Sequence, residues 1–205
     1  MKFLITLVST VWIAIIGTIA AQAETDKPAV IEMSLGMEAA PIEVIEYASF
    51  TCPHCKNFND NIFPKLKSEY IDTGKIKFIY RETYFDRYSV WANMVARCAP
   101  QQSFFGVVKE IYSEQENWLP LARANKDLEV VEEFRKIGKL AGLTDPDLDS
   151  CLADREMLKE LIGWHKTNME THEISGTPGI VIDGVVISST SFEAISKLLD
   201  EKLGS

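Results

Sequence analysis

Two cysteines, Cys52 and Cys55, stand where an apolar strand gives way to a helix, and this junction constrains the fold most strongly. The run Ile42 to Ala48 before them is apolar on both faces, which is typical of a central strand covered by layers on both sides. After Cys55, apolar residues recur at helical spacing. Pro53 suits the first helical turn, because that position needs no backbone N–H. The pattern therefore predicts a thiol pair on the first turn of a helix.

This position should favour a negative sulfur on Cys52. The first turn of a helix presents unpaired N–H groups and the positive end of the helix dipole, and both stabilise a thiolate over a neutral thiol. His54, if it is protonated, adds a second positive influence on the same sulfur. We therefore expect the pKa of Cys52 to lie below that of an ordinary cysteine.

One carboxylate precedes the thiols, because Glu46 lies six residues before Cys52 and shares a strand face with Ile42 and Val44. A buried carboxylate near a thiol pair could exchange protons with Cys55, and burial would raise its pKa. The alternative is a Glu at the strand end that points to water. The sequence supports the two interpretations equally.

The first 23 residues have the pattern of a secretory signal peptide. Lys2 precedes an apolar run from Phe3 to Ala20, and Ala21-Gln22-Ala23, whose two alanines are the small residues of a cleavage site, precedes the polar Glu24. An uncleaved membrane anchor is the alternative, since about eighteen apolar residues approach the length that spans a bilayer. Cleavage is favoured because charge follows the small residues at once. We therefore expect an exported chain that begins at residue 24 after processing.

Export and charge narrow the functional classes. The net charge is −9, and it becomes −10 without residues 1–23, which hold one Lys and no acid. This acidic balance argues against nucleic acid as a partner. Export also places four cysteines in an oxidising compartment, where disulfides persist. For Cys98 and Cys151, a structural disulfide is favoured over free buried thiols, and they lack the close spacing expected of a second redox centre.

The other elements follow a regular order. Residues 30–33 are a possible edge strand, the helix from Pro53 should extend to about residue 72, and residues 76–80 supply a strand that implies a right-handed parallel crossover. Two apolar runs around Asp183-Gly184 predict a hairpin. Thr190 and Glu193 have the spacing of a capping box for the last helix.

Between these strands, from about residue 87 to 173, helical periodicity dominates. Helices are expected over residues 89–99, 102–114, 127–141, 145–153 and 154–171, with Asp145 as a cap and Pro100, Pro120 and Gly142 at the joins. The order predicts an α/β fold with a mixed central sheet. Its core would comprise residues 24–87 and 174–205, and residues 88–173 would form a helical insertion domain.

With these motifs in place, the sequence resembles the DsbA-like thiol:disulfide oxidoreductases of the bacterial periplasm, in the thioredoxin superfamily. The resemblance rests on Cys52-Pro53-His54-Cys55, on Glu46 ahead of it, and on Thr177-Pro178 before the hairpin, and it covers the chain from about residue 42. It implies a thioredoxin-like fold in which Pro178 is cis and lies beside the active sulfurs, and in which the Thr177 backbone pairs with an extended substrate strand. An ordinary trans proline in a turn is the alternative.

The resemblance also implies an activity. The protein would donate the Cys52–Cys55 disulfide to cysteine pairs in unfolded exported proteins of the periplasm, through a mixed disulfide. A quinone-linked, DsbB-like membrane partner would reoxidise the pair, and no cofactor or metal is implied. Thr177 departs from the Val of the best-known members and is more typical of periplasmic isomerases, so an isomerase or reductase is an alternative. Residues 24–41 are too few for the dimerisation domain of those isomerases, so we expect a monomer.

Two other classes are less favoured. A structural zinc site needs four ligands, and no second close Cys/His pair accompanies Cys52 and Cys55. His165 and His172 are seven residues apart on one expected helix, where they would lie on its surface or in a seam. A non-catalytic binding protein on a thioredoxin scaffold is the other option, because fold alone does not fix function.

Overall fold

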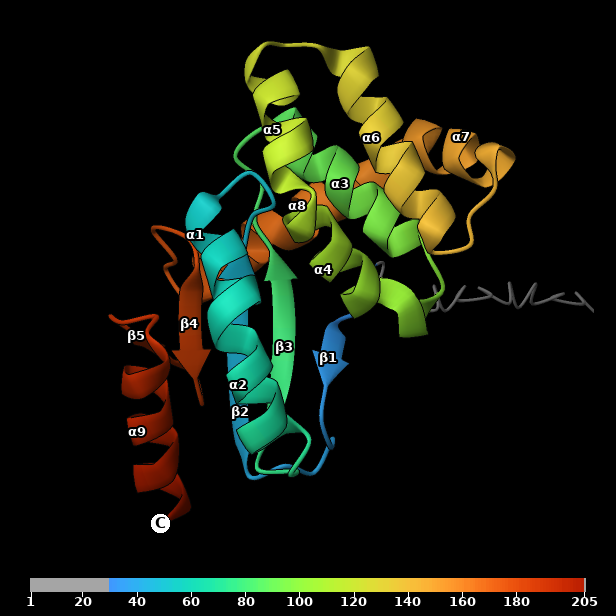
Figure 1. Cartoon of the computed structure of the whole chain (residues 1–205). Coiled ribbons are helices and arrows are strands. Elements are labelled where there is room, and N and C mark those ends of the chain that lie inside the picture. Colours follow the sequence, from blue (N-terminus) through green and yellow to red (C-terminus); the bar gives the residue numbers. More distant parts are fainter. Residues whose placement is uncertain (1–29, 205) are drawn as a thin grey trace, which may run out of the picture.

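The fold is built on a five-stranded mixed sheet within residues 30–204, the part of the chain that the computed structural model describes (Figure 1). The expected signal peptide lies outside these residues. The strand order is β1-β3-β2-β4-β5, and only β2 and β3 in this described part pair in parallel. The strands are β1 (Met33–Leu35), β2 (Ile42–Ala48), β3 (Ile76–Glu82), β4 (Gly179–Ile182) and β5 (Val185–Ile187). The predicted mixed sheet is confirmed.

Strand β2 is central and is covered on both faces, as its apolar sequence predicts. Val44 belongs to the main core, whereas Ile45 and Tyr47 belong to a smaller cluster on the opposite face. The period of two along a strand produces this division, because successive side chains point to opposite faces. All three side chains are almost fully buried. Glu46, between them in sequence, therefore faces the main core.

The helix that carries the cysteines runs continuously from Pro53 to Ile71, close to its predicted end. It comprises α1 (Pro53–Asn57), a π-helical turn (Phe58–Ile62), α2 (Phe63–Leu66) and a second π-helical turn (Lys67–Ile71). Pro64 has no N–H to donate to the carbonyl four residues earlier. The first π-helical turn adjoins this gap, and there the N–H of Phe63 donates to the carbonyl of Phe58, five residues back. In Figure 1, α1 and α2 lie in front of the sheet.

The middle of the chain is helical, as expected. The observed helices are α3 (Arg87–Cys98), a 3-10 turn (Gln101–Ser103), α4 (Phe104–Ser113), α5 (Gln115–Arg123), α6 (Asp127–Leu140), α7 (Asp145–Ala153) and α8 (Arg155–Thr171). Helices α3 to α7 gather at one end of the sheet (Figure 1). The domain boundaries at residues 88 and 173 stay a prediction.

Helix α5 was not expected from the sequence, and the expectation that Pro120 lies at a join between helices is wrong. Pro120 lies inside α5. Trp118 is fully buried and its ring contacts the Phe134 ring of α6 at 5.1 Å between centroids. Leu119 is also buried. Packing of this apolar face outweighs the single backbone hydrogen bond that a proline removes.

Three boundaries also differ from expectation. The edge strand is Met33–Leu35 rather than residues 30–33, because Val30 packs in a separate cluster with Val90 and Met94. Thr144, not Asp145, caps α7, and it forms a capping box with Asp147. The last helix, α9 (Phe192–Leu203), is capped by Ser191, whose hydroxyl oxygen accepts a hydrogen bond from the N–H of Ala194. The expected capping box from Thr190 is therefore wrong.

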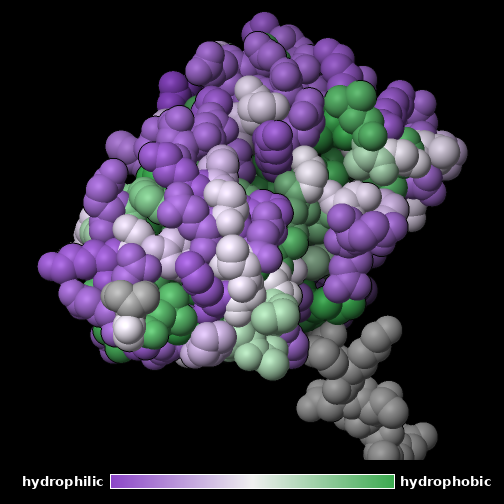
Figure 2. All heavy atoms as spheres, turned by 60° about the horizontal axis from the view of Figure 1, so that its bottom comes forward, coloured by the Kyte–Doolittle hydropathy of each residue, from purple (hydrophilic) through white to green (hydrophobic). Residues whose placement is uncertain are grey.

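The hairpin between β4 and β5 is confirmed. Asp183 and Gly184 have φ angles of 46° and 78°, the two positive values that a type I′ turn requires. Hydrophilic residues cover most of the face shown in Figure 2, with hydrophobic surface in separate patches between them. No helix within residues 30–204 combines the length and the apolar character needed to cross a membrane.

Candidate active site

The fold places the two thiols differently at the start of α1. Cys52 is the N-cap residue, with extended backbone (φ −90°, ψ 117°), and Pro53 is the first helical residue, as predicted. Cys55 is fully buried, whereas Cys52 is half-buried. Both are free thiols in this structure. Cys52 follows the carboxyl end of β2, the edge at which open sheets of this kind place their chemistry.

Hydrogen bonds favour a thiolate at Cys52. They lower its pKa from 9.0 to about 5, chiefly through the bond from the Cys55 thiol, and partial burial opposes this shift. The Thr177 side chain and the backbone N–H groups of Cys55 and His54 lower the pKa further. The direction agrees with the expectation from the sequence. The exposed His54 contributes through its backbone N–H, as a residue in the first helical turn can.

The pKa of Cys55 is shifted in the opposite direction, upward. Burial is the largest of the causes that raise the pKa of its thiol, followed by its hydrogen bond to Cys52 and the charge of Glu46. A thiolate on Cys55 would lie in an apolar core without water to solvate it. The pair therefore combines one sulfur that is stable as an anion with one that is not.

Glu46 is buried, with 3% of its surface exposed, which decides between the two interpretations left open by the sequence. Desolvation raises the pKa of this carboxyl to about 8, with a smaller contribution from the charge on Cys52. Its Oε1 has no hydrogen-bond partner among the residues described. A cavity of about 10 Å³, roughly the space of one water molecule, adjoins it. The cavity is lined by Glu46, Asn59, Phe63, Phe78, Tyr80, Phe105 and Val108.

The Thr177-Pro178 peptide bond is cis, which sets aside the trans alternative. The Cys52 thiol donates a hydrogen bond to the carbonyl oxygen of Thr177, at 3.4 Å. The segment before β4 thus lies against the active sulfur, although the two are 125 residues apart in sequence. Helical residues and a loop that are far apart along the chain therefore form one site.

Gln115 is a site residue that the sequence analysis missed. Its side-chain N–H groups donate to the carbonyl oxygens of Phe50 and Cys52, at 2.7 and 3.2 Å, and it is 3% exposed. It is the first residue of α5, the helix that the sequence analysis did not recognise. No motif marks an isolated Gln of this kind. Its contacts fix the backbone of the active-site loop to the helical region.

A polar network holds the opposite face of β2. The Tyr47 hydroxyl lies 2.6 Å from Nδ1 of His172 and 3.0 Å from the carbonyl oxygen of Asn168, and Arg81 donates to it at 2.9 Å. His172 therefore lies in a seam, one of the two places expected for it. Burial and the charge of Arg81 lower the pKa of His172. Within residues 30–204, no three His, Cys, Asp or Glu side chains gather to hold a metal ion.

Cys98 and Cys151 are joined by a disulfide between α3 and α7, with 6.1 Å between their Cα atoms. Val30, Val90, Met94 and Leu161 form the buried cluster around it. The bond therefore links two helices of the middle region through an apolar environment.

Comparison with known proteins shows which family this chain belongs to. A family model described as Thioredoxin matches residues 29–201. The chain belongs to the thioredoxin family. The chain is similar to the crystal structure of Wolbachia pipientis alpha-DsbA1, with a TM-score of 0.76 and 27% identity over 84% of this chain and 91% of that one. BdbD from Bacillus subtilis (oxidised) has a TM-score of 0.72 at 21% identity, over 85% and 94% of the two chains, and so shows the fold alone.

The names of curated relatives of this chain refer to disulfide chemistry. A protein-disulfide oxidoreductase of Rickettsia bellii is 32% identical over 173 residues, which are 84% of this chain and 64% of the relative. Disulfide bond formation protein D of Bacillus anthracis is 26% identical over 180 residues, 84% and 78% of the two chains. The chain spans less than two thirds of the length of the Rickettsia relatives. The DsbA-like resemblance and the thioredoxin-like fold are confirmed.

Proposed function

We propose that this protein is a thiol:disulfide oxidoreductase that oxidises cysteine pairs in exported proteins by donating the Cys52–Cys55 disulfide. The observation that supports this most directly is the contrast between the two thiols. Cys52 is half-buried and its pKa is lowered to about 5, whereas burial raises the pKa of Cys55. Such a contrast is typical of a reactive cysteine paired with a buried one. The names of the relatives agree with the proposal.

The reaction would begin from the oxidised pair. A substrate thiolate attacks the Cys52 sulfur, a new sulfur–sulfur bond forms there, and the electrons of the old bond pass to Cys55. Cys55 is a poor anion in its buried position, so it needs a proton as it leaves. The Glu46 carboxyl, whose pKa of about 8 keeps it mainly protonated at neutral pH, is the proposed donor.

The second step releases the product. The other thiolate of the substrate attacks the substrate sulfur of the mixed disulfide, and Cys52 leaves as a thiolate. The substrate has then lost two electrons and the Cys52–Cys55 pair has gained them. Because Cys52 is stable as an anion, it leaves readily and the pair is oxidising.

The loop at Thr177 would hold the substrate. We propose that its backbone pairs with an extended substrate segment, because its carbonyl already lies 3.4 Å from the Cys52 sulfur. We also propose that the protein is exported to the periplasm, where it acts as a monomer on unfolded exported proteins. A DsbB-like, quinone-linked membrane partner would reoxidise the Cys52–Cys55 pair. We assign Cys98–Cys151 a structural role.

Equilibration against glutathione buffers tests the proposal and its alternatives. A strongly oxidising poise of the Cys52–Cys55 pair is expected, and oxidation of a reduced, unfolded substrate should be lost in Cys52→Ser. A thioredoxin-like poise would instead favour a reductase, and repair of scrambled disulfides without net oxidation would favour an isomerase. Full function of Cys52→Ser would leave a non-catalytic binding protein as the better account.

A further inference from the structure

A groove of about 730 Å³ lies between the helix that carries the cysteines and α4. Its apolar walls come from Leu35, Phe63, Pro64 and Phe105. Small-molecule sites in proteins have volumes of about 300 to 1,000 Å³, are concave and are mainly apolar, with a few polar groups that fix orientation. The groove has the size and the lining of such a site, and the mechanism above makes no use of it.

The rim of the groove is basic, although the whole chain has a net charge of −9. Lys56, Lys67 and Lys109 contribute three ammonium groups, and Asp60 contributes one carboxylate. Lys56 pairs with Asp60 at 2.6 Å, and Lys67 pairs with Asp72 outside the groove. Within the described part of the chain, Lys109 has neither an ion pair nor a side-chain hydrogen bond. The rim therefore offers one exposed cation beside an apolar hollow.

We propose that this groove binds a small amphipathic anion, namely a fatty acid. The alkyl chain would pack on Leu35, Phe63 and Phe105, and the carboxylate would pair with Lys109. An alkyl chain matches the apolar walls through the hydrophobic effect. A lone lysine is a compact point charge that suits a single carboxylate. The concave shape favours a small molecule over a second protein, whose interface would be broader and flatter.

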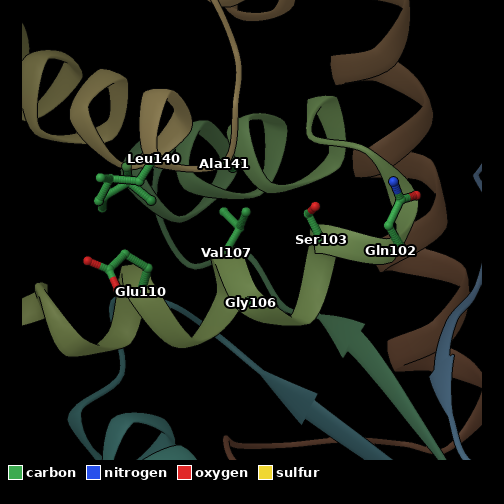
Figure 3. Close-up of a pocket in the computed structure, with 8 residues that line it drawn as sticks. Gln102, Ser103, Gly106, Val107, Glu110, Leu140 and Ala141 are labelled. Atoms are coloured by element: carbon green, nitrogen blue, oxygen red, sulfur yellow. The ribbon is translucent and has the colours of Figure 1, made fainter.

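A second hollow, between α4 and α6, does not fit the same ligand. Figure 3 shows Val107 and Glu110 of α4 facing the end of α6, where Leu140 lies. Its lining includes the carboxylate of Glu110 and no lysine or arginine. An anion would be repelled there. Gly106 lines both hollows, whereas Lys109 lines only the first of them.

Gly106 offers a way to fill the groove. A Cβ built on it would meet no atom within 4 Å, and its φ is not positive, so a larger side chain there causes no clash near the backbone. Gly163 in α8 has the same open surroundings and does not line the groove. Gly106→Leu and Gly163→Leu therefore form a matched pair, with the same substitution at an exposed helical glycine.

The test is calorimetric titration of the purified chain with dodecanoate, below the concentration at which it forms micelles. We expect saturable 1:1 binding, weakened about tenfold or more by Gly106→Leu and by Lys109→Gln, and unchanged by Gly163→Leu. Dodecyltrimethylammonium, with the same chain and the opposite charge, should not bind. Circular dichroism establishes that each variant is folded. If Gly106→Leu does not fold, Lys109→Gln and the cationic amphiphile decide.

Three results would overturn the proposal. They are absence of saturable binding, equal affinity in Lys109→Gln and the unchanged chain, or equal affinity for the anionic and the cationic amphiphile. Loss of binding in Gly106→Leu with full binding in Lys109→Gln would place the ligand in the hollow between α4 and α6, and would also refute it.

Discussion

The lowered pKa of Cys52 makes the stability of the reduced protein depend on pH in a defined window. Its pKa is 9.0 when unperturbed and about 5 in the fold. A group whose pKa is lowered by folding stabilises the fold fully above its unfolded pKa, and this stabilisation is lost as the pH falls through the folded pKa. The reduced protein should therefore lose this contribution between about pH 9 and pH 5.

The magnitude follows from the shift. One pKa unit corresponds to 1.36 kcal/mol, so at pH 7, two units above the folded value, Cys52 would contribute roughly 2.7 kcal/mol. At pH 5 about 0.4 kcal/mol of this remains. Because Cys52 is only half-buried, solvent screening reduces the difference, and we expect a change of about 1–2 kcal/mol between the two pH values.

The assay is urea unfolding of the reduced protein and of reduced Cys52→Ser, each at pH 7 and pH 5, with a reductant that stays active in acid. Other titrating groups contribute to both proteins, so the difference between the two free energies of unfolding isolates Cys52. The expected outcome is that the advantage of the unchanged protein over Cys52→Ser shrinks on acidification. An advantage that is the same at both pH values would refute the reasoning about this thiolate.

Three further predictions concern residues around the thiols. Glu46→Gln should stabilise the protein by about 5 kcal/mol at pH 9, because a carboxyl whose pKa is raised from 4.5 to about 8 destabilises the fold as the pH rises through that window, and equal stability of the two proteins at pH 9 would contradict the assignment. The same variant should oxidise substrate more slowly at pH 7 in stopped flow. Gln115→Ala should cost about 1–3 kcal/mol in urea unfolding, since it removes two hydrogen bonds and, among the described residues, only the Cys52 carbonyl keeps another donor, the Lys56 N–H. The exposed Gln102→Ala should cost almost nothing. The double Cys98→Ala/Cys151→Ala variant should lose up to about 4 kcal/mol of its free energy of unfolding, because the disulfide no longer closes a loop of 53 residues in the unfolded chain. Iodoacetamide trapping across a pH series should find the pKa of Cys52 unchanged in this variant, and a changed pKa would show that the disulfide has a role in the redox chemistry.

The features that local sequence patterns determine were predictable. The thiol pair on the first helical turn, the two-faced central strand and the Asp183-Gly184 hairpin each depend on a few neighbouring residues. Composition and spacing fix these elements because the physical causes, a turn conformation or a period of two, act within the segment itself.

The features that depend on contacts between residues far apart in sequence were not predictable. Pro120 is a helix breaker in isolation, and only the packing of Trp118 on α6 explains why α5 continues through it. Because α5 was not predicted, Gln115 was not recognised either, and its role depends on carbonyl groups more than sixty residues away. The burial of Glu46 likewise follows from what covers β2, and nothing in its neighbours along the chain decides it.

The alternation of side chains along β2 connects the two walls of the site. Glu46 faces the main core, to which Cys55 belongs, and the next residue, Tyr47, faces the opposite layer, where it contacts Asn168 and His172 at the end of α8. Five residues beyond His172, Thr177 meets the Cys52 sulfur. Glu46, the proposed proton donor, and Tyr47, which contacts the end of α8, are therefore adjacent on one strand, and we expect a change at the end of α8 to affect the site from the face of the sheet opposite the thiols.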